Sequence, residues 1–227
     1  MRFMANAMSF IRCKGVMAST VLALLAVPAH AAVLSVTVVG TDGKGVPGAV
    51  VVAETRQGYP AARTGVTASM DQRDLMFVPE VLVVRTGTSV NFPNSDEVRH
   101  QVYSFSLAKV FQLALYEGRA HPPVVFDRAG IVTLGCNIHD GMIGYIYVTE
   151  SPWYGRTDSH GALQLKDIPD GLYTIKVWHP RLAEPTPQLE QSISLDKAQS
   201  NGLRFQLKKP LRSTTYQHGT DKQWQSY

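Results

Sequence analysis

The sequence carries little net charge, no sustained helical period and few cysteines. Its 227 residues include 22 Lys and Arg against 18 Asp and Glu. The cations form no basic stripe, so nucleic acid is not an expected partner. Beyond residue 31 no apolar run is long enough to span a membrane. A hydrophobic fraction of 44% is ordinary for a chain that buries a core. The length and the many short alternating segments predict an all-β protein of one large or two small domains.

The first 31 residues have the three-part pattern of a secretory signal peptide. Arg2, Arg12 and Lys14 give a positive start, an apolar run over 16–27 follows, and residues 29–31 (Ala-His-Ala) form a small-residue cleavage site. The run is too short for a spanning helix, which favours a cleaved signal over an uncleaved anchor. Cys13 lies before the run, which disfavours a lipoprotein. Cleavage would leave 19 Lys and Arg against 18 Asp and Glu, and the expected location is the periplasm.

Cysteine is rare in this sequence, and its rarity is informative. The chain has two, and Cys13 would leave with the signal peptide, so the exported protein would keep only Cys136. Exported proteins usually pair their cysteines in disulfides. A lone cysteine there indicates an intermolecular bridge, a reactive thiol or a metal ligand.

The residues that follow Cys136 favour the metal ligand. His139 and Met142 continue a Cys-x2-His-x2-Met spacing, and apolar segments on both sides of this loop are typical of strands. A thiolate, an imidazole and a thioether suit copper, whereas methionine is a poor ligand for zinc. A fourth ligand must come from elsewhere, and the best candidate is His100, which ends a polar loop before another predicted strand.

Two segments together resemble the cupredoxins, the type 1 blue copper proteins. One runs from Val81 to His100 as Val-Leu-Val-Val-x2-Gly-x2-Val-x-Phe-x-Asn-x-Asp-x3-His, and the other is Cys136-x2-His139-x2-Met142-x-Gly144. The short second loop is similar to that of amicyanin and of the exported "methylamine utilization protein" group. The resemblance covers residues 69–150.

That resemblance implies a Greek-key β-sandwich or barrel holding one mononuclear type 1 copper ion. It implies that the ligands are His100, Cys136, His139 and Met142. The activity implied is the transfer of single electrons between periplasmic redox partners, such as a c-type cytochrome or a dehydrogenase, without enzymatic chemistry. The sequence departs from the family at Gln101, where Asn or Ser is common, and at Asp140, where many relatives have an uncharged residue.

The flanking segments resemble a second family. Residues 33–53 have the strand-turn-strand opening of carboxypeptidase-regulatory-like (transthyretin-like) sandwiches, and residues 157–180 have the Thr-Asp, Gly and Pro-x-Gly-x-Tyr signals of its second half. We therefore expect a split sandwich over 32–54 and 151–208, which the cupredoxin domain interrupts. Residues 55–67 are turn-rich and read as a linker, and 209–227 as a flexible tail.

Simpler interpretations compete at several residues. Cys136 could be a plain buried thiol, Met142 core filling and His100 a strand-edge histidine. We expect the remaining histidines of the exported chain not to be ligands: His121, His160, His179 and His218. Three aromatic residues are expected to pack between the two sandwiches rather than to bind a sugar: Trp153, Tyr154 and Trp178.

Two other functions are compatible with the same sequence. A copper-delivery protein would employ the same four residues but exchange the metal readily. If the protein were instead a non-redox β-sandwich binding module, the spacing of these four residues would be fortuitous. A nitrite reductase is disfavoured, because such enzymes need a second metal site and no further histidine cluster is visible.

Overall fold

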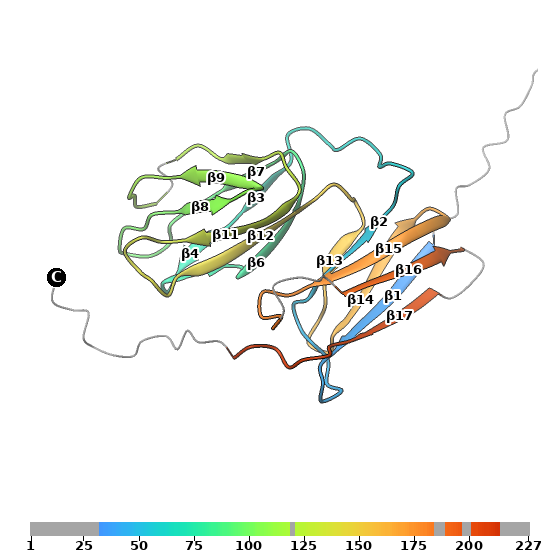
Figure 1. Cartoon of the computed structure of the whole chain (residues 1–227). Coiled ribbons are helices and arrows are strands. Elements are labelled where there is room, and N and C mark those ends of the chain that lie inside the picture. Colours follow the sequence, from blue (N-terminus) through green and yellow to red (C-terminus); the bar gives the residue numbers. More distant parts are fainter. Residues whose placement is uncertain (1–31, 119–120, 184–188, 197–200, 214–227) are drawn as a thin grey trace, which may run out of the picture.

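The computed structural model describes residues 32–118, 121–183, 189–196 and 201–213 (Figure 1). All regular structure in these residues is β, which confirms the all-β prediction. No helix among them could cross a membrane. The predicted signal peptide and residues 214–227 of the predicted tail lie outside the described residues.

The first and last described segments together form one sandwich of two sheets, called here the split sandwich. One sheet has the order β14 (Ala162–Ile168), β1 (Ala32–Val39) and β17 (Asn201–Gln206). The other has the order β13 (Tyr154–Arg156), β2 (Val50–Glu54), β15 (Gly171–Trp178) and β16 (Leu189–Leu195). β1 pairs antiparallel with β14 and parallel with β17, so it is the central strand of its sheet.

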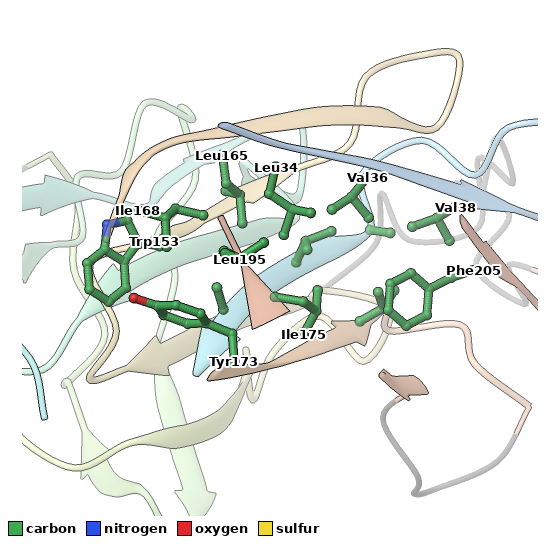
Figure 2. Close-up of a cluster of buried hydrophobic side chains, with 14 of the residues drawn as sticks. Leu34, Val36, Val38, Trp153, Leu165, Ile168, Tyr173, Ile175, Leu195 and Phe205 are labelled. Atoms are coloured by element: carbon green, nitrogen blue, oxygen red, sulfur yellow. The ribbon is translucent and has the colours of Figure 1, made fainter. Parts of the chain in front are cut away.

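Side chains that alternate along the strands fill the core between these two sheets (Figure 2). Leu34, Val36 and Val38 of β1 are all buried, as the period of two predicts. Trp153 also belongs to this core: its ring meets that of Tyr173 edge to face at 5.6 Å. The expectation that Trp153 packs between the sandwiches is therefore wrong. Its indole N–H donates to the carbonyl of Asp167, 2.9 Å away within the split sandwich, so the ring is held there.

Gly161 closes the turn before β14 in a way that only glycine allows. Its φ is +74°, and an added Cβ would lie 2.2 Å from the carbonyl oxygen of Val38. Gly161→Ala should therefore destabilise the chain by about 1–3 kcal/mol, as measured by urea unfolding. Gly202→Ala is the matched control, because an added Cβ there meets nothing within 4 Å. Equal stability of the two variants would contradict the prediction.

The strands between β2 and β13 form a second sandwich, called here the inserted sandwich. Its smaller sheet has the order β10 (Val124–Phe126), β7 (Thr88–Asn91) and β3 (Thr67–Ser69). The larger has the order β6 (Val81–Arg85), β12 (Ile143–Thr149), β11 (Gly130–Gly135), β8 (Tyr103–Ser106) and β9 (Lys109–Gln112). Its core includes Phe92, Phe126, Leu134 and Ile146, together with Cys136 and Met142.

A separate hairpin of β4 (Asp71–Arg73) and β5 (Met76–Val78) lies beside these sheets. The sequence predicts only a short apolar segment over 75–77. The observed turn residues, Asp74 and Leu75, have φ of +54° and +58°, which is uncommon for residues other than glycine. β4 escaped the sequence analysis because it is polar and three residues long.

A small apolar cluster joins the two sandwiches. Val50 and Val52 of β2 pack with Val81 and Tyr147 of the inserted sandwich, and Tyr154 and Trp178 pack against this group. Tyr154 and Trp178 thus lie where the sequence analysis expected them. The Arg156 guanidinium adds a hydrogen bond to the Val81 carbonyl at 3.0 Å, which directly links the two sandwiches.

His179, next to this junction, predicts a loss of stability in acid. Burial, with the nearby cations Arg181 and Arg156, lowers the pKa of His179 from 6.5 to about 4. Its Nδ1 accepts the Arg181 backbone N–H at 3.1 Å, an arrangement that needs this nitrogen unprotonated. Because the folded pKa is the lower one, His179 favours folding fully above pH 6.5, and that contribution falls as the pH drops towards 4.

The change His179→Gln should flatten the pH dependence of the free energy of unfolding over this window. Urea titrations at several pH values between 7 and 4 measure it. His160→Gln, at an exposed turn, is the matched control. An unchanged acid loss in His179→Gln would show that other groups cause it.

Candidate metal centre

The loop that carries the Cys-x2-His-x2-Met motif joins two paired strands. β11 ends at Gly135 and β12 begins at Ile143, and these two residues pair across the ladder. Within the loop the Met142 amide donates to the His139 carbonyl at 2.9 Å, which closes a tight turn. The side chains of Cys136 and Met142 are buried and that of His139 is half-buried.

His100 reaches this loop from a distant part of the chain. It forms an isolated bridge with Tyr116, in which each residue's amide donates to the other's carbonyl, at 3.1 and 2.9 Å. The side chain of Asn94 secures the same loop by donating to the carbonyls of Val98 and Tyr116. These bonds fix the backbone at His100, whose side chain is fully buried.

Three ligand atoms converge at this point. The Nδ1 atoms of His100 and His139 are 3.2 Å apart, and the Cys136 Sγ lies 3.8 Å from the first and 3.7 Å from the second. The point equidistant from all three lies about 2.1 Å from each, close to the metal–nitrogen distances of about 2.0–2.1 Å and metal–thiolate distances of about 2.3 Å found in proteins. The group can therefore hold one metal ion without rearrangement.

Asp96 fixes which nitrogen of His100 faces the group. Its Oδ2 lies 2.7 Å from the His100 Nε2, so the proton of the neutral imidazole resides on Nε2 and is donated to the carboxylate. The Nδ1 lone pair then points at His139 and Cys136. A carboxylate behind a ligating histidine orients the ring and raises its basicity.

The turn of the β4–β5 hairpin holds this carboxylate. The amides of Asp74 and Leu75 donate to the two oxygens of Asp96 at 2.6 and 3.1 Å. The positive φ angles at Asp74 and Leu75 give this turn its shape. A second carboxylate, Asp71, accepts from the Ser95 hydroxyl at 2.9 Å, which ties the hairpin to the loop before His100. The sequence analysis includes Asp96 in the motif that ends at His100, but it assigns no role to this residue.

The pKa shifts at the site favour the binding of a cation. Burial acts to raise the pKa of Asp96, but the hydrogen bonds from His100, Leu75 and Asp74 outweigh it and hold that pKa below its usual value. Burial and the neighbouring His100 lower the pKa of His139. The site thus combines an ionised carboxylate with an unprotonated imidazole near neutral pH.

A buried tyrosine, Tyr116, supports the loop that carries His100. The Tyr116 hydroxyl donates to the Phe92 carbonyl at 2.6 Å and accepts from the Gln72 side-chain amide. Burial raises the pKa of Tyr116 to about 12, so it remains a neutral phenol. Because Tyr116 also bridges to His100 and Gln72 lies in β4, this network connects the hairpin, the loop and His100.

The other sequence-predicted residues fall into three groups. Met142 shares a buried cluster with Cys136, so both of its predicted uses, fourth ligand and core filling, fit its position. Asp140 is exposed beside His139. Among the remaining histidines, His121 contacts the Tyr116 ring and the Ala114 carbonyl, His160 and His179 lie in the split sandwich, and His218 lies outside the described residues.

No protein-family model and no curated protein sequence matches this chain. Solved structures with partial likeness include the purple cupredoxin from Nitrosopumilus maritimus, which is 21% identical with a TM-score of 0.32 over 37% of this chain and 99% of that one. A reduced amicyanin variant is 17% identical with a TM-score of 0.34 over 43% and 97%.

The copper-containing nitrite reductase from Thermus scotoductus SA-01 is 24% identical with a TM-score of 0.36, over 40% of this chain and only 24% of that protein. All three likenesses are confined to less than half of this chain. The function is therefore inferred from the geometry of the site itself.

Proposed function

We propose that this protein is an exported type 1 copper protein that carries single electrons. The observation that carries the proposal is the convergence of two imidazole Nδ1 atoms and the Cys136 Sγ within 3.2–3.8 Å of one another. His100, Cys136 and His139 would hold the ion, with the Met142 thioether as a weak fourth ligand. Copper bound there would supply one-electron chemistry by cycling between Cu(I) and Cu(II).

The donor set favours copper over zinc. Two imidazoles and one thiolate, with a thioether as a weak further ligand, suit both oxidation states of copper. Structural zinc sites are tetrahedral and closed by a fourth strong ligand. Among the described residues, no fourth His, Cys, Asp or Glu side chain belongs to this group.

Neighbouring residues of the chain keep the site rigid and exclude water from one side of it. The paired strands β11 and β12 hold both ends of the loop, and the Asp96 carboxylate holds the His100 ring. Burial of His100 and Cys136 excludes water from that side of the site. A site whose ligands stay in place requires little rearrangement when the charge changes, which suits a carrier better than a protein that hands its metal over.

The half-buried His139 is the ligand nearest to solvent and is the proposed point of electron exchange. The predicted signal peptide supports a periplasmic location, where a c-type cytochrome or a dehydrogenase would be a suitable partner. No bond-making chemistry is proposed for the chain.

Adding Cu(II) to the purified metal-free protein tests the proposal. The expected product is intensely blue, because thiolate-to-Cu(II) charge transfer absorbs visible light, and it should show a type 1 electron paramagnetic resonance spectrum. Chemical reduction should bleach the colour reversibly while the copper remains bound after dialysis. A colourless copper complex would contradict the proposal, and loss of copper on reduction would indicate a delivery protein instead.

A further inference from the structure

A cavity of about 300 Å³ lies between the two sandwiches. The split sandwich contributes Glu54, which ends β2, and Lys176 of β15, and the linker over 55–67 contributes Tyr59. The inserted sandwich contributes residues at the start of β11 and the end of β12, among them Ile131, Tyr147 and Glu150. Small-molecule sites often lie at such junctions and start at volumes of about 300 Å³, so this cavity can hold a small ligand.

Lys176 is the only cation among the described residues that line the cavity, and it is already neutralised. Its ammonium lies 2.8 Å from the Glu54 carboxylate and 3.6 Å from that of Glu190. An ammonium held between two carboxylates leaves no net positive charge to attract an anion. The lining therefore does not select an acidic ligand.

The Glu150 carboxylate, in contrast, has no cationic partner. No ion pair within the part of the chain that the structure describes includes Glu150. Burial raises the pKa of Tyr59, and the charges of Glu54 and Glu150 raise it further, against the opposing charge of Lys176. Two carboxylates and one ammonium thus act together on the Tyr59 hydroxyl, which gives this part of the cavity a net negative charge.

Arg85 lies beside the cavity without reversing that balance. Its guanidinium donates to the carbonyls of Glu150 and Pro60 and is not part of the lining. Counted with Lys176, it gives two cations against the three carboxylates of Glu54, Glu150 and Glu190. The bonds from Arg85 also tie the linker to the end of β12, so this rim of the cavity is fixed.

The wall opposite these charges is apolar and aromatic. Ile131 and Tyr147 pair across the β11–β12 ladder and belong to the apolar cluster at the junction. Calcium is bound by about six to eight oxygen ligands, which a wall of this kind does not supply. An organic ammonium compound suits both parts, because aromatic rings and carboxylates attract its cation and the apolar side chains accept its carbon chain.

We propose that this cavity binds a small organic ammonium compound, with its cation beside Glu150 and its carbon chain against Ile131 and Tyr147. Such a ligand contacts both sandwiches, so its binding holds them together. The proposal does not depend on copper, because no residue of the lining is a candidate metal ligand.

Isothermal titration calorimetry tests the proposal on the chain purified from a host that exports it, without added copper. The probes share a four-carbon chain: n-butylammonium, n-butanol and butyrate. Butylammonium should occupy one saturable site and bind at least about tenfold more tightly than butanol, and butyrate should bind least. In nuclear magnetic resonance spectra, butylammonium should shift the amide signals of residues 129–131 and 147–150 but not those of residues 136–142.

Glu150→Gln should weaken butylammonium binding by about tenfold and leave butanol binding unchanged, which separates a lost charge from a damaged cavity. Glu80→Gln is the matched control, because Glu80 is exposed just before β6, at the end of that strand opposite to Arg85, and should keep native affinity. Circular dichroism would show that both variants fold. Four results would each overturn the proposal: no saturable butylammonium binding, equal binding of butanol or butyrate, native affinity in Glu150→Gln, or shifts confined to the metal loop.

Discussion

The variant Cys136→Ser will show no blue colour with Cu(II), and copper will no longer raise its melting temperature. The Cys136 Sγ lies 3.7–3.8 Å from both imidazole nitrogens, so it is the atom of the proposed site that would give charge transfer to Cu(II). A serine hydroxyl is not deprotonated near neutral pH and is a poor ligand for copper. In the native protein, free copper at a hundred times its dissociation constant should stabilise the fold by about 2.7 kcal/mol.

Absorption spectroscopy and thermal unfolding with and without copper measure both effects. His121→Ala is the matched control: His121 contacts Tyr116 near the site but is not in the ligand group, so this variant should remain blue. A blue Cys136→Ser protein would place the metal elsewhere. Equal melting temperatures of native protein with and without copper would favour the fortuitous site of a non-redox binding module.

Asp96→Asn will weaken copper binding by about 10–100-fold, the range typical when the carboxylate behind a ligating histidine is lost. Asparagine keeps the size of the side chain but removes the charge that the His100 Nε2–H meets at 2.7 Å. The amide can also present its NH2 group to Nε2, which would favour the wrong tautomer of His100. Competition with a chelator of known copper affinity measures the change.

Two further readouts separate this positioning role from simple damage to the fold. The reduction potential should rise, because a less basic His100 stabilises Cu(II) less, and the circular dichroism spectrum of the metal-free variant should remain that of the native fold. Asp42→Asn, at an exposed turn of the split sandwich, should alter none of these quantities. Native copper affinity in Asp96→Asn would show that the carboxylate only packs the loop.

The sequence predicts those parts of the site that a local pattern or a strong hydrophobic period encodes. Cys136 and His139 lie on one loop between alternating strands, so their proximity follows from spacing alone. His100 could be named because it ends a loop before a strand, yet its position depends on the Tyr116 bridge, which no local pattern reveals. The structure brings these three side chains together, and the ligand roles of all four residues stay predictions.

The role of Asp96 could not be predicted from the motif, because it depends on a contact between distant segments. The backbone amides of residues 74 and 75 donate to its carboxylate, and they can do so because both residues adopt positive φ. No glycine in the turn indicates this conformation in the sequence. Trp153 was misassigned for a related reason. Its apolar character indicates burial, but the hydrogen bond to Asp167, which no sequence period specifies, decides which of two adjacent cores receives it.

The pairing of β2 with β13 places the two junctions of the inserted sandwich side by side. Tyr154 lies opposite Val52, and the Ala53 amide donates to the Trp153 carbonyl at 2.9 Å, so the chain leaves β2 and returns to β13 at neighbouring positions of one ladder. A short β-turn could bridge that gap. The split sandwich could thus accept a different inserted domain between β2 and β13 while the order of its own strands stays the same.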